Sequence, residues 1–585
     1  MKRKEKKGSP SGLICRNVWS IRRKKRSPAR RKKGLIMDAS DKTQHTSPEK
    51  HEDPLAPFSK DKEGRPLRPD LAEVLYRHSF GLDEYRPEAV EKRRQRNQRT
   101  ARANIADLCD PGTFIEYGAL TMAAQRGRRS LDDLIRRTPA DGMIAGIGQV
   151  NGALFGEEKA RCMIMAYDYT VLAGTQGHFN HKKKDRMLKL AYDQRLPLVF
   201  FGEGGGGRPG DVDAEGVMVA GLDLTTFASF ARLSGRVPMI GLVSGYCFAG
   251  NAALLGCCDV IIAAQNANIG MGGPVMIEGG GLGVFKPEEV GPMEVQTKNG
   301  VVDIAVADDV EMVAVAKKYL SYFQGAIPTW EAEDQTILRD LIPENRRRAY
   351  NVRKIIQILA DKGTFLEIRP QFGQGMITGL LRIEGRPFGL IANNCMHTAG
   401  AIEADDADKA VRLMQICEAH GLPIISLCDT PGFMVGPEIE KKAQVRHVCR
   451  MFVVGAHLTV PYFTVILRRG YGLGVMAMAK GGFHESFFTI SWPTGEFGGM
   501  GLEGAVKAGF RRELEAVEDP QEREALYQKL VALAYERGKA INMAAHLEID
   551  AVIDPAETRR WIIRGLKSAP PRRLEEPRHA YVDPW

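Results

Sequence analysis

The sequence predicts an α/β fold built from two related halves. Apolar runs typical of buried strands alternate with segments of helical spacing, and glycine turns follow the strands. Motifs also occur twice in the same order: DPGTFIE at residues 110–116 returns as DKGTFLE at 361–367, and GMIAG at 142–146 returns as GMITG at 375–379. The offset between copies shrinks steadily along the chain, as an internal duplication with a few loop insertions in the first copy predicts.

The elements of the two halves follow one another in the same order. In the first half, residues 162–166 form an apolar run suited to a buried strand, 181–193 have helical spacing, and 198–201 form the next strand. In the second half, residues 404–420 are the matching helix and 424–427 the matching strand. This order predicts a largely parallel sheet in each half.

The remaining segments set the predicted domain limits. Residues 1–68 are basic and then polar and proline-rich, which predicts a disordered tail and linker. We expect one domain over residues 69–330 and a second over 345–585, ending in a helical extension. Residues 84–107 carry many charges and few large apolar side chains, which predicts a helical stretch on the surface.

The composition, 44% hydrophobic and 26% charged, is that of an ordinary globular protein. No run approaches the ~20 apolar residues that a membrane helix needs, so we expect no membrane partner. Ten cysteines without a C-x-x-C pair indicate reduced thiols and no structural zinc. His178 and His181 lie three residues apart but lack further ligands nearby, so no metal site is predicted.

The net charge of +10 comes from the N-terminal tail. Residues 1–36 hold fifteen Lys or Arg and one acid, which leaves −4 for the rest of the chain. Such a tail can bind nucleic acid or act as a transit peptide. We interpret it as disordered, or as a consequence of start-site choice, and expect no nucleic-acid partner. The predicted location is the cytoplasm, or the mitochondrial matrix if the tail is a transit peptide.

Glycine turns at the strand ends are the candidate catalytic elements. They are GGGGR at residues 204–208 and GYCFAG at 245–250, matched by TPGF at 430–433 and GYGLG at 470–474. Two turns that aim N–H groups at one point make an oxyanion hole, although each turn alone could serve packing only. No P-loop, Rossmann fingerprint or G-x-S-x-G elbow is present.

No side chain stands out as a nucleophile or general base, which favours a reaction that stabilises an enolate through backbone N–H groups. Basic residues suited to the phosphates of an acidic cofactor do occur, and they could equally form a solvated face. They are Arg126, Arg128, Arg129 and Lys182, Lys183 and Lys184.

Over residues 70–560 the chain resembles the carboxyltransferase (β) subunits of biotin-dependent acyl-CoA carboxylases, the propionyl-CoA and methylcrotonyl-CoA carboxylase group. The most specific stretch is LCDTPGF at residues 427–433, followed by YGLG at 471–474 and WPTGE at 492–496. In the first half, CFAG at 247–250 matches in kind. The resemblance implies two tandem crotonase-like domains of spiral ββα units, which assemble into a homo-oligomer, usually a hexamer.

The resemblance also implies how the reaction is divided. The N-terminal domain would hold acyl-CoA and the C-terminal domain carboxybiotin, whose N1 is usually proposed as the base. The implied oxyanion-hole residues are Gly205, Gly206, Ala249 and Gly250 in the first half, and Gly432, Phe433, Leu473 and Gly474 in the second. The sequence contains neither an ATP-grasp pattern nor a biotinylation tetrapeptide, so a biotin carboxylase and biotin carrier partner would supply the biotin.

Two departures from the family pattern bear on the substrate and alternatives. The family turn SGGAR is GGGGR here, and YGGAYD is YGLGVM, which puts Met476 at the acyl end of the implied pocket. We therefore expect an acyl group bulkier or more apolar than propionyl. One alternative is the carboxyltransferase subunit of a biotin-dependent decarboxylase. Another is a crotonase-type hydratase or isomerase that uses Glu278 and Glu496.

Overall fold

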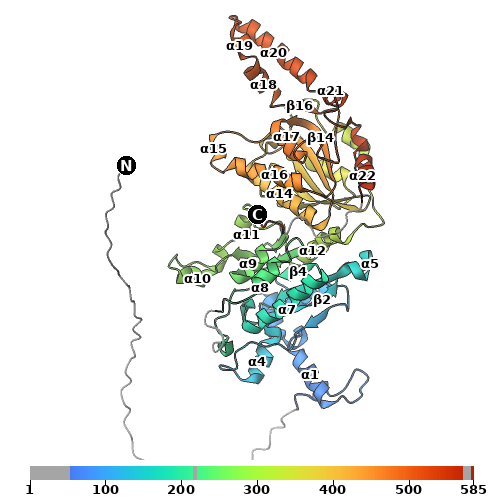
Figure 1. Cartoon of the computed structure of the whole chain (residues 1–585). Coiled ribbons are helices and arrows are strands. Elements are labelled where there is room, and N and C mark those ends of the chain that lie inside the picture. The colour runs from blue at the N-terminus through green and yellow to red at the C-terminus, as the bar shows by residue number, and fades with distance from the viewer. Residues whose placement is uncertain (1–52, 215–220, 571–580) are drawn as a thin grey trace, which may run out of the picture. The chain divides into compact units, whose positions relative to one another are not determined.

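The computed structural model describes residues 53–214, 221–570 and 581–585, and Pro57–Trp585 form one compact unit. Most of the predicted basic tail, residues 1–52, lies outside the described residues. Helices and strands alternate along the rest of the chain, as Figure 1 shows. Among the described residues, no helix has the length and apolar character that crossing a membrane requires.

Each half contributes one large sheet. The first has seven strands in the order β1-β2-β3-β4-β5-β7-β9, and the second has eight along β10-β11-β12-β13-β14-β15-β17, with β16 paired to β14. The strands of the first half are β1 Ile115–Tyr117, β2 Met143–Gln149, β3 Arg161–Tyr167, β4 Leu198–Phe201, β5 Met239–Val243, β7 Val260–Ala264 and β9 Ile304–Val306, with a separate pair of β6 Tyr246–Phe248 and β8 Asn268–Gly270. Those of the second half are β10 Leu366–Ile368, β11 Met376–Ile383, β12 Arg386–Asn393, β13 Ile424–Thr430, β14 Tyr462–Tyr471, β15 Phe488–Ser491, β16 Glu496–Gly498 and β17 Ala551–Val552.

The helices of the first half are α1 Pro69–Ser79, α2 Pro87–Arg94, α3 Ala101–Leu108, α4 Leu131–Arg137, α5 Gly152–Phe155, α6 Glu157–Ala160, α7 His178–Gln194, α8 Thr226–Ala231, α9 Gly250–Gly256, α10 Pro274–Gly279, α11 Met293–Gln296 and α12 Asp309–Gln324. Those of the second half are α13 Val352–Leu359, α14 Ala404–His420, α15 Pro437–Glu440, α16 Gln444–His457, α17 Gly472–Met478, α18 Leu502–Gly509, α19 Arg511–Glu515, α20 Pro520–Arg537, α21 Ala540–Ala545 and α22 Thr558–Ser568. The predicted helix at 404–420 coincides with α14, and that at 181–193 lies within α7.

The two sheets are paired alike, as the predicted duplication requires. The repeated sequence motifs form the same antiparallel ladder in each copy, with Glu116 opposite Gly146 and Glu367 opposite Gly379. The first two pairings of each sheet are antiparallel and the later ones parallel, so each sheet is largely parallel, as predicted, with an antiparallel edge. Glycine occupies this position in both copies because a side chain would not fit. A methyl group on Gly146 would lie 2.1 Å from a carbonyl oxygen of the neighbouring strand, and one on Gly379 would lie 2.5 Å from the equivalent oxygen.

The charged stretch at residues 84–107 differs from its prediction. It forms two helices, because the Thr100 side chain accepts a hydrogen bond from the Ala103 N–H and starts α3 afresh. The expected surface position is wrong for α3, where Ile105 and Leu108 are buried. These side chains belong to the same apolar cluster as α12, and this packing outweighs the local abundance of charge.

The two halves share part of their apolar core. Val313 and Leu320 of α12 lie in one cluster with Leu380 of β11 and Leu413 of α14. Every one of these side chains is almost fully buried. The halves are therefore packed together through α12, while the predicted domain limits stay a prediction.

Candidate active site

Two turns of the first half converge at the carboxyl ends of β4 and β5. Gly204 is bridged to Cys247, and a methyl group on Gly206 would lie only 2.7 Å from the Ala249 Cβ. Ala249 has φ 52° and ψ −122°, a backbone conformation that non-glycine residues rarely adopt. It precedes α9, so the N–H of Gly250 lies in a first helical turn, where no intrahelical acceptor exists.

The hydrogen bonds of these turns show which N–H groups face a ligand. The N–H groups of Gly205 and Ala249 donate to backbone carbonyl oxygens at 3.1 and 3.0 Å. That of Gly206 donates to the Asn251 side chain at 3.2 Å. Gly207, which sequence reasoning did not select, donates no hydrogen bond within the described part of the chain. The geometry therefore leaves the Gly207 N–H for a ligand, and the predicted roles of the other three stay predictions.

The second half also brings its two predicted turns together. A methyl group on Gly474 would lie 2.7 Å from the Gly432 Cα and 3.1 Å from the Phe433 nitrogen. The Gly432 N–H donates to the Thr430 hydroxyl at 3.1 Å, whereas the Phe433 N–H has no acceptor among the described residues. Leu473 lies in the first turn of α17 and its side chain is exposed.

Backbone β-pairings align the two sites residue by residue. The equivalent bridges are Gln176 with Gly207 and Ile402 with Phe433, and also Gly204 with Cys247 and Thr430 with Gly470. Gly207 therefore corresponds to Phe433, and Gly250 to Leu473. Each half therefore has a corresponding pair of N–H groups at its turns, and the predicted oxyanion role of Gly205 and Gly206 stays a prediction.

A buried carboxylate lies beneath each site. Glu203 ends the strand before the first turn and pairs with Arg93 at 2.8 Å. Burial raises the pKa of Glu203 to about 7, although the Arg93 guanidinium acts in the opposite direction. In the second half, Asp429 pairs with Arg468 at 3.1 Å and Arg469 at 2.7 Å. Both carboxylates are held by guanidinium groups, so they fix the strand ends.

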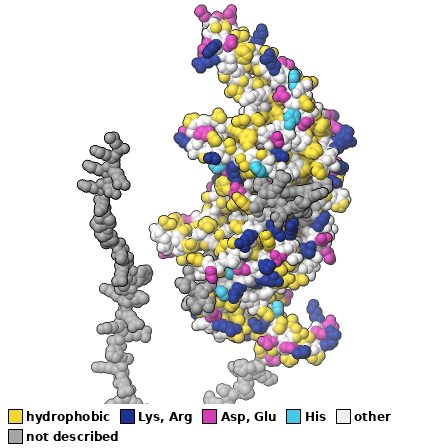
Figure 2. Space-filling view, viewed as in Figure 1, with side chains coloured by type: hydrophobic (Ala, Val, Ile, Leu, Met, Phe, Trp, Pro, Cys, Tyr) yellow, Lys and Arg dark blue, Asp and Glu magenta, His cyan; other side chains and the backbone are white. Residues whose placement is uncertain are grey.

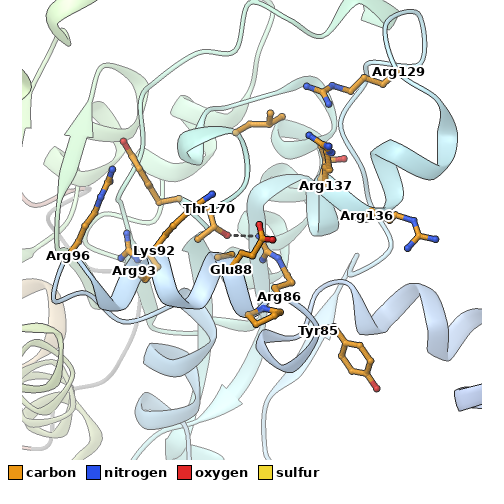
Figure 3. A pocket seen from close by; sticks show the side chains of 15 residues that line it. Tyr85, Arg86, Glu88, Lys92, Arg93, Arg96, Arg129, Arg136, Arg137 and Thr170 are labelled. Atoms are coloured by element: carbon orange, nitrogen blue, oxygen red, sulfur yellow. Dashed lines mark hydrogen bonds between the residues drawn. The ribbon is translucent and has the colours of Figure 1, made fainter.

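A basic cavity of about 760 Å³ opens beside the first site (Figure 3). Seven of its lining residues are cationic: Arg86, Lys92, Arg93, Arg96, Arg129, Arg136 and Arg137. Leu172 also lines the cavity. The carbonyl oxygen of the next residue, Ala173, accepts the hydrogen bond from the Gly205 N–H. The cavity therefore adjoins the turn that contains Gly207. Five of its seven cations pair with carboxylates, and the excess of positive charge suits an anionic ligand.

The predicted phosphate-binding residues are dispersed. Arg129 lines the basic cavity, whereas Arg126, Arg128 and Lys182 are exposed. Lys183 is buried and its ammonium donates to two backbone carbonyls; burial lowers its pKa to about 8. Lys184 is likewise buried, and its amine donates hydrogen bonds to the Tyr167 hydroxyl and the Gln176 side-chain oxygen. Contact of these residues with phosphate stays a prediction.

An apolar cavity of about 580 Å³ lies beside α17. Met476 lines it and is 38% exposed. The other large apolar side chains in its wall are Leu473, Val475, Phe483, Phe497, Leu502 and Met543. Within the described ranges, no group of three or more His, Cys, Asp or Glu side chains could hold a metal ion.

Residues 92–579 match the model of the carboxyl transferase domain. The chain belongs to this family. It is 29% identical over 499 residues to the methylmalonyl-CoA carboxyltransferase 12S subunit of Propionibacterium freudenreichii subsp. shermanii, covering 83% of this chain and 92% of that protein. It is 28% identical over 523 residues to the biotin-dependent long chain acyl-coenzyme A carboxylase beta4 subunit of Mycobacterium tuberculosis, covering 85% of this chain and 93% of that subunit.

Solved structures agree with the sequence relatives. A single-chain, multi-domain long-chain acyl-CoA carboxylase is 56% identical, with a TM-score of 0.81 over 86% of this chain. The chain spans about half the length of that protein, 49%. The transcarboxylase 12S structure is 27% identical, with a TM-score of 0.74 over 89% of this chain and 98% of that one. The predicted resemblance and tandem crotonase-like fold are confirmed, and the chain is a carboxyltransferase enzyme of the acyl-CoA carboxylase type.

Proposed function

We propose that this chain transfers a carboxyl group from biotin to the α-carbon of an acyl-CoA, with one oxyanion hole for each reactant. The supporting observation is that the two halves present equivalent pairs of N–H groups, Gly207 with Gly250 and Phe433 with Leu473. Such pairs stabilise a developing negative charge on oxygen without accepting a proton. This matches a reaction that passes through an enolate.

The first half is proposed to hold the acyl-CoA. Its N–H pair would bind the thioester oxygen, and the basic cavity beside it suits the phosphates of coenzyme A. Within this cavity Lys92 and Arg96 carry no carboxylate partner among the described residues, so their charge is available to an anionic ligand. Arg129 is the member of the sequence-predicted set that would contribute.

The second half is proposed to hold biotin. The N–H groups of Phe433 and Leu473 fit its ureido oxygen, a neutral acceptor that needs donors and no cation. Biotin, when bound, would bring the carboxyl group and a basic nitrogen. The residues of this chain would orient the ureido group and exclude water. The biotin would be carried and carboxylated by a partner protein or domain.

The acyl chain is proposed to be long and apolar. The cavity beside Met476 has the walls that such a chain needs. Because this cavity lies in the second half, it would receive the acyl chain of a coenzyme A thioester bound by the first half of a neighbouring subunit in the proposed oligomer. The 56% identical structure is that of a long-chain acyl-CoA carboxylase. Each methylene buried there contributes up to ~0.8 kcal/mol. The cavity thus supports the sequence prediction of a substrate more apolar than propionyl-CoA.

Assembly into a homo-oligomer, with a hexamer as in the 12S relative, is part of the proposal. The segment around α10 exposes many apolar side chains and is largely yellow and white in Figure 2. Met271, Val275, Leu282 and Val284 are 71%, 83%, 76% and 78% exposed. Contiguous exposed apolar residues of this kind mark interaction surfaces. A cytoplasmic location stays a prediction.

Carboxylation is proposed over decarboxylation because the named relatives with known activity are carboxylases or a transcarboxylase. The hydratase alternative finds little support in its two candidate acids. Glu278 is exposed on α10, and Glu496 forms a 2.6 Å ion pair with Arg346.

The deciding experiment compares the purified chain with and without a biotinylated biotin carboxylase partner, in the presence of ATP, bicarbonate and an acyl-CoA. We expect no product from the chain alone and carboxyl-CoA formation with the partner. Hydration of an enoyl-CoA without biotin, or ATP-dependent carboxylation by the chain alone, would reject the proposal.

A further inference from the structure

The two oxyanion holes are held together by different means. In the second half the turns touch directly, since a methyl group on Gly474 would meet the Gly432 backbone at 2.7 Å. The equivalent position in the first half is Asn251, whose side chain is fully buried between the two turns. A methyl group on Gly204 would lie 2.2 Å from its amide nitrogen. The side chain therefore fills the space beside Gly204, while at Gly206 the first turn approaches Ala249 of the other turn directly.

All four hydrogen-bonding positions of the Asn251 amide are used. Its oxygen accepts from the Gly206 N–H at 3.2 Å and from the Gln176 amide at 3.0 Å. Its nitrogen donates to the carbonyl oxygens of Gly174 and Gly202 at 3.3 and 3.4 Å. One side chain of α9 thus ties together the turn after β4, the strand end before it and the neighbouring loop.

A second amide fixes the orientation of the first. The Gln176 oxygen accepts from the buried Lys184 amine at 2.9 Å, which leaves its nitrogen to donate to Asn251. Lys184 also donates to the Tyr167 hydroxyl at 2.8 Å. The Gln176 backbone pairs with the same turn, because its N–H donates to the Gly206 carbonyl at 2.7 Å. Lys184 thus donates to Gln176 and Gln176 donates to Asn251, whose amide oxygen also accepts from the Gly206 N–H of the turn.

We propose that Asn251, oriented by Gln176 and Lys184, is a positioning residue that sets the spacing between the Gly207 and Gly250 N–H groups. This inference rests on the proposed function. The Asn251 amide oxygen accepts the hydrogen bond from the Gly206 N–H. The N–H of the following residue, Gly207, is then available to the thioester oxygen. Because both donors must reach one oxygen at ~2.7–3.1 Å, a change in spacing removes one of them.

The test compares Asn251→Gly, which copies the second half, and Gln176→Leu with a matched control, Gln324→Leu. Gln324 is a buried amide that donates to two carbonyls at the opposite end of β3, away from the site. We expect Asn251→Gly and Gln176→Leu to lower kcat by roughly 100-fold, the loss typical of one oxyanion donor. The dissociation constant of acyl-CoA should stay within about threefold, because the phosphates bind elsewhere. Gln324→Leu should lower thermal stability without this loss of kcat.

Two further measurements distinguish positioning from general destabilisation. The kcat losses of Asn251→Gly and Gln176→Leu should be strongly non-additive in the double variant, whereas Asn251→Gly and Gln324→Leu should combine additively. Hydrogen exchange in peptides covering residues 202–208 should rise in Asn251→Gly and stay unchanged in Gln324→Leu.

Two outcomes would overturn the inference: a kcat within threefold of the parent for Asn251→Gly, or additive losses with Gln176→Leu. If Asn251→Gly does not fold, the test uses Gln176→Leu alone, since this substitution leaves both turns intact. A kcat of Gln176→Leu within threefold of the parent would then overturn the inference. A parent enzyme that transfers no carboxyl group with any acyl-CoA and biotinylated partner would instead reject the proposed function.

Discussion

The Gly474→Ala substitution should disable the second oxyanion hole while leaving the fold intact. The added methyl group would lie 2.7 Å from the Gly432 Cα and 2.8 Å from its carbonyl carbon, where ordinary contacts begin at 3.4 Å. The two backbones must therefore separate by about 0.7 Å. The donor range of an oxyanion hole is narrower, ~0.4 Å, so one N–H group is lost and kcat should fall by about 10²–10³, or ~2.7–4 kcal/mol.

The assay is carboxyl transfer with the biotinylated partner at saturating acyl-CoA, alongside thermal unfolding. Gly509→Ala is the control, since a methyl group there meets nothing within 4 Å. Gly250→Ala should cost less than Gly474→Ala, because its methyl group meets only the end of the Gln176 side chain at 3.0 Å. A folded Gly474→Ala enzyme with kcat within twofold of the parent would refute this account of the second half.

Three other predictions concern the substrate and the buried acid. In a series from acetyl-CoA to palmitoyl-CoA, kcat/KM should rise by about fourfold per methylene until the cavity at Met476 is full; a maximum at acetyl or propionyl would contradict the long-chain proposal. The double substitution Lys92→Glu, Arg96→Glu should raise KM for acyl-CoA without changing kcat. The KM for an acyl-pantetheine substrate, which lacks the nucleotide phosphates, should stay unchanged. Equal increases in KM for both substrates would show that coenzyme A does not bind in this cavity. Glu203 has its pKa raised by burial from 4.5 to about 7, so its contribution to stability is present below pH 4.5 and is lost as the pH rises through 7. Relative to the parent, Glu203→Gln should therefore gain up to about 3 kcal/mol of unfolding free energy between pH 4.5 and 8, measured by urea denaturation at each pH; parallel pH profiles of the two proteins would show that Glu203 does not titrate in this window.

The fold was predictable because the duplication repeats backbone requirements. Gly146 and Gly379 face a carbonyl oxygen of the neighbouring strand at the same register position, so glycine had to recur in both copies. The helix at 404–420 was predicted as the counterpart of the helical segment at 181–193 in the first copy. Burial of Ile105 was not, because it depends on α12, about two hundred residues later in the chain.

The sequence predicted which turns would form the candidate site. Local sequence shows a run of four glycines at 204–207 but not which N–H groups are already bonded. That selection depends on Asn251 and Gln176, which come from other segments. The same reason accounts for Lys183, whose charge suggested a phosphate contact but whose ammonium is bonded to backbone carbonyls.

The assignment of acyl-CoA to the first half has a structural argument besides family resemblance. The second half has a comparable arginine-lined cavity of about 700 Å³ beside its own turn. There, however, Arg468 and Arg469 pair with Asp429, and Arg346 pairs with Glu496. In the described chain this leaves one lining cation of the second cavity, Arg347, without a carboxylate partner. The first cavity is lined by seven cations, of which Lys92 and Arg96 have no carboxylate partner in the described chain. A polyanionic substrate should therefore favour the first half, and the neutral ureido group the second. The duplicated backbone supplies the same pair of N–H groups twice, and the charges around each pair decide which reactant it receives.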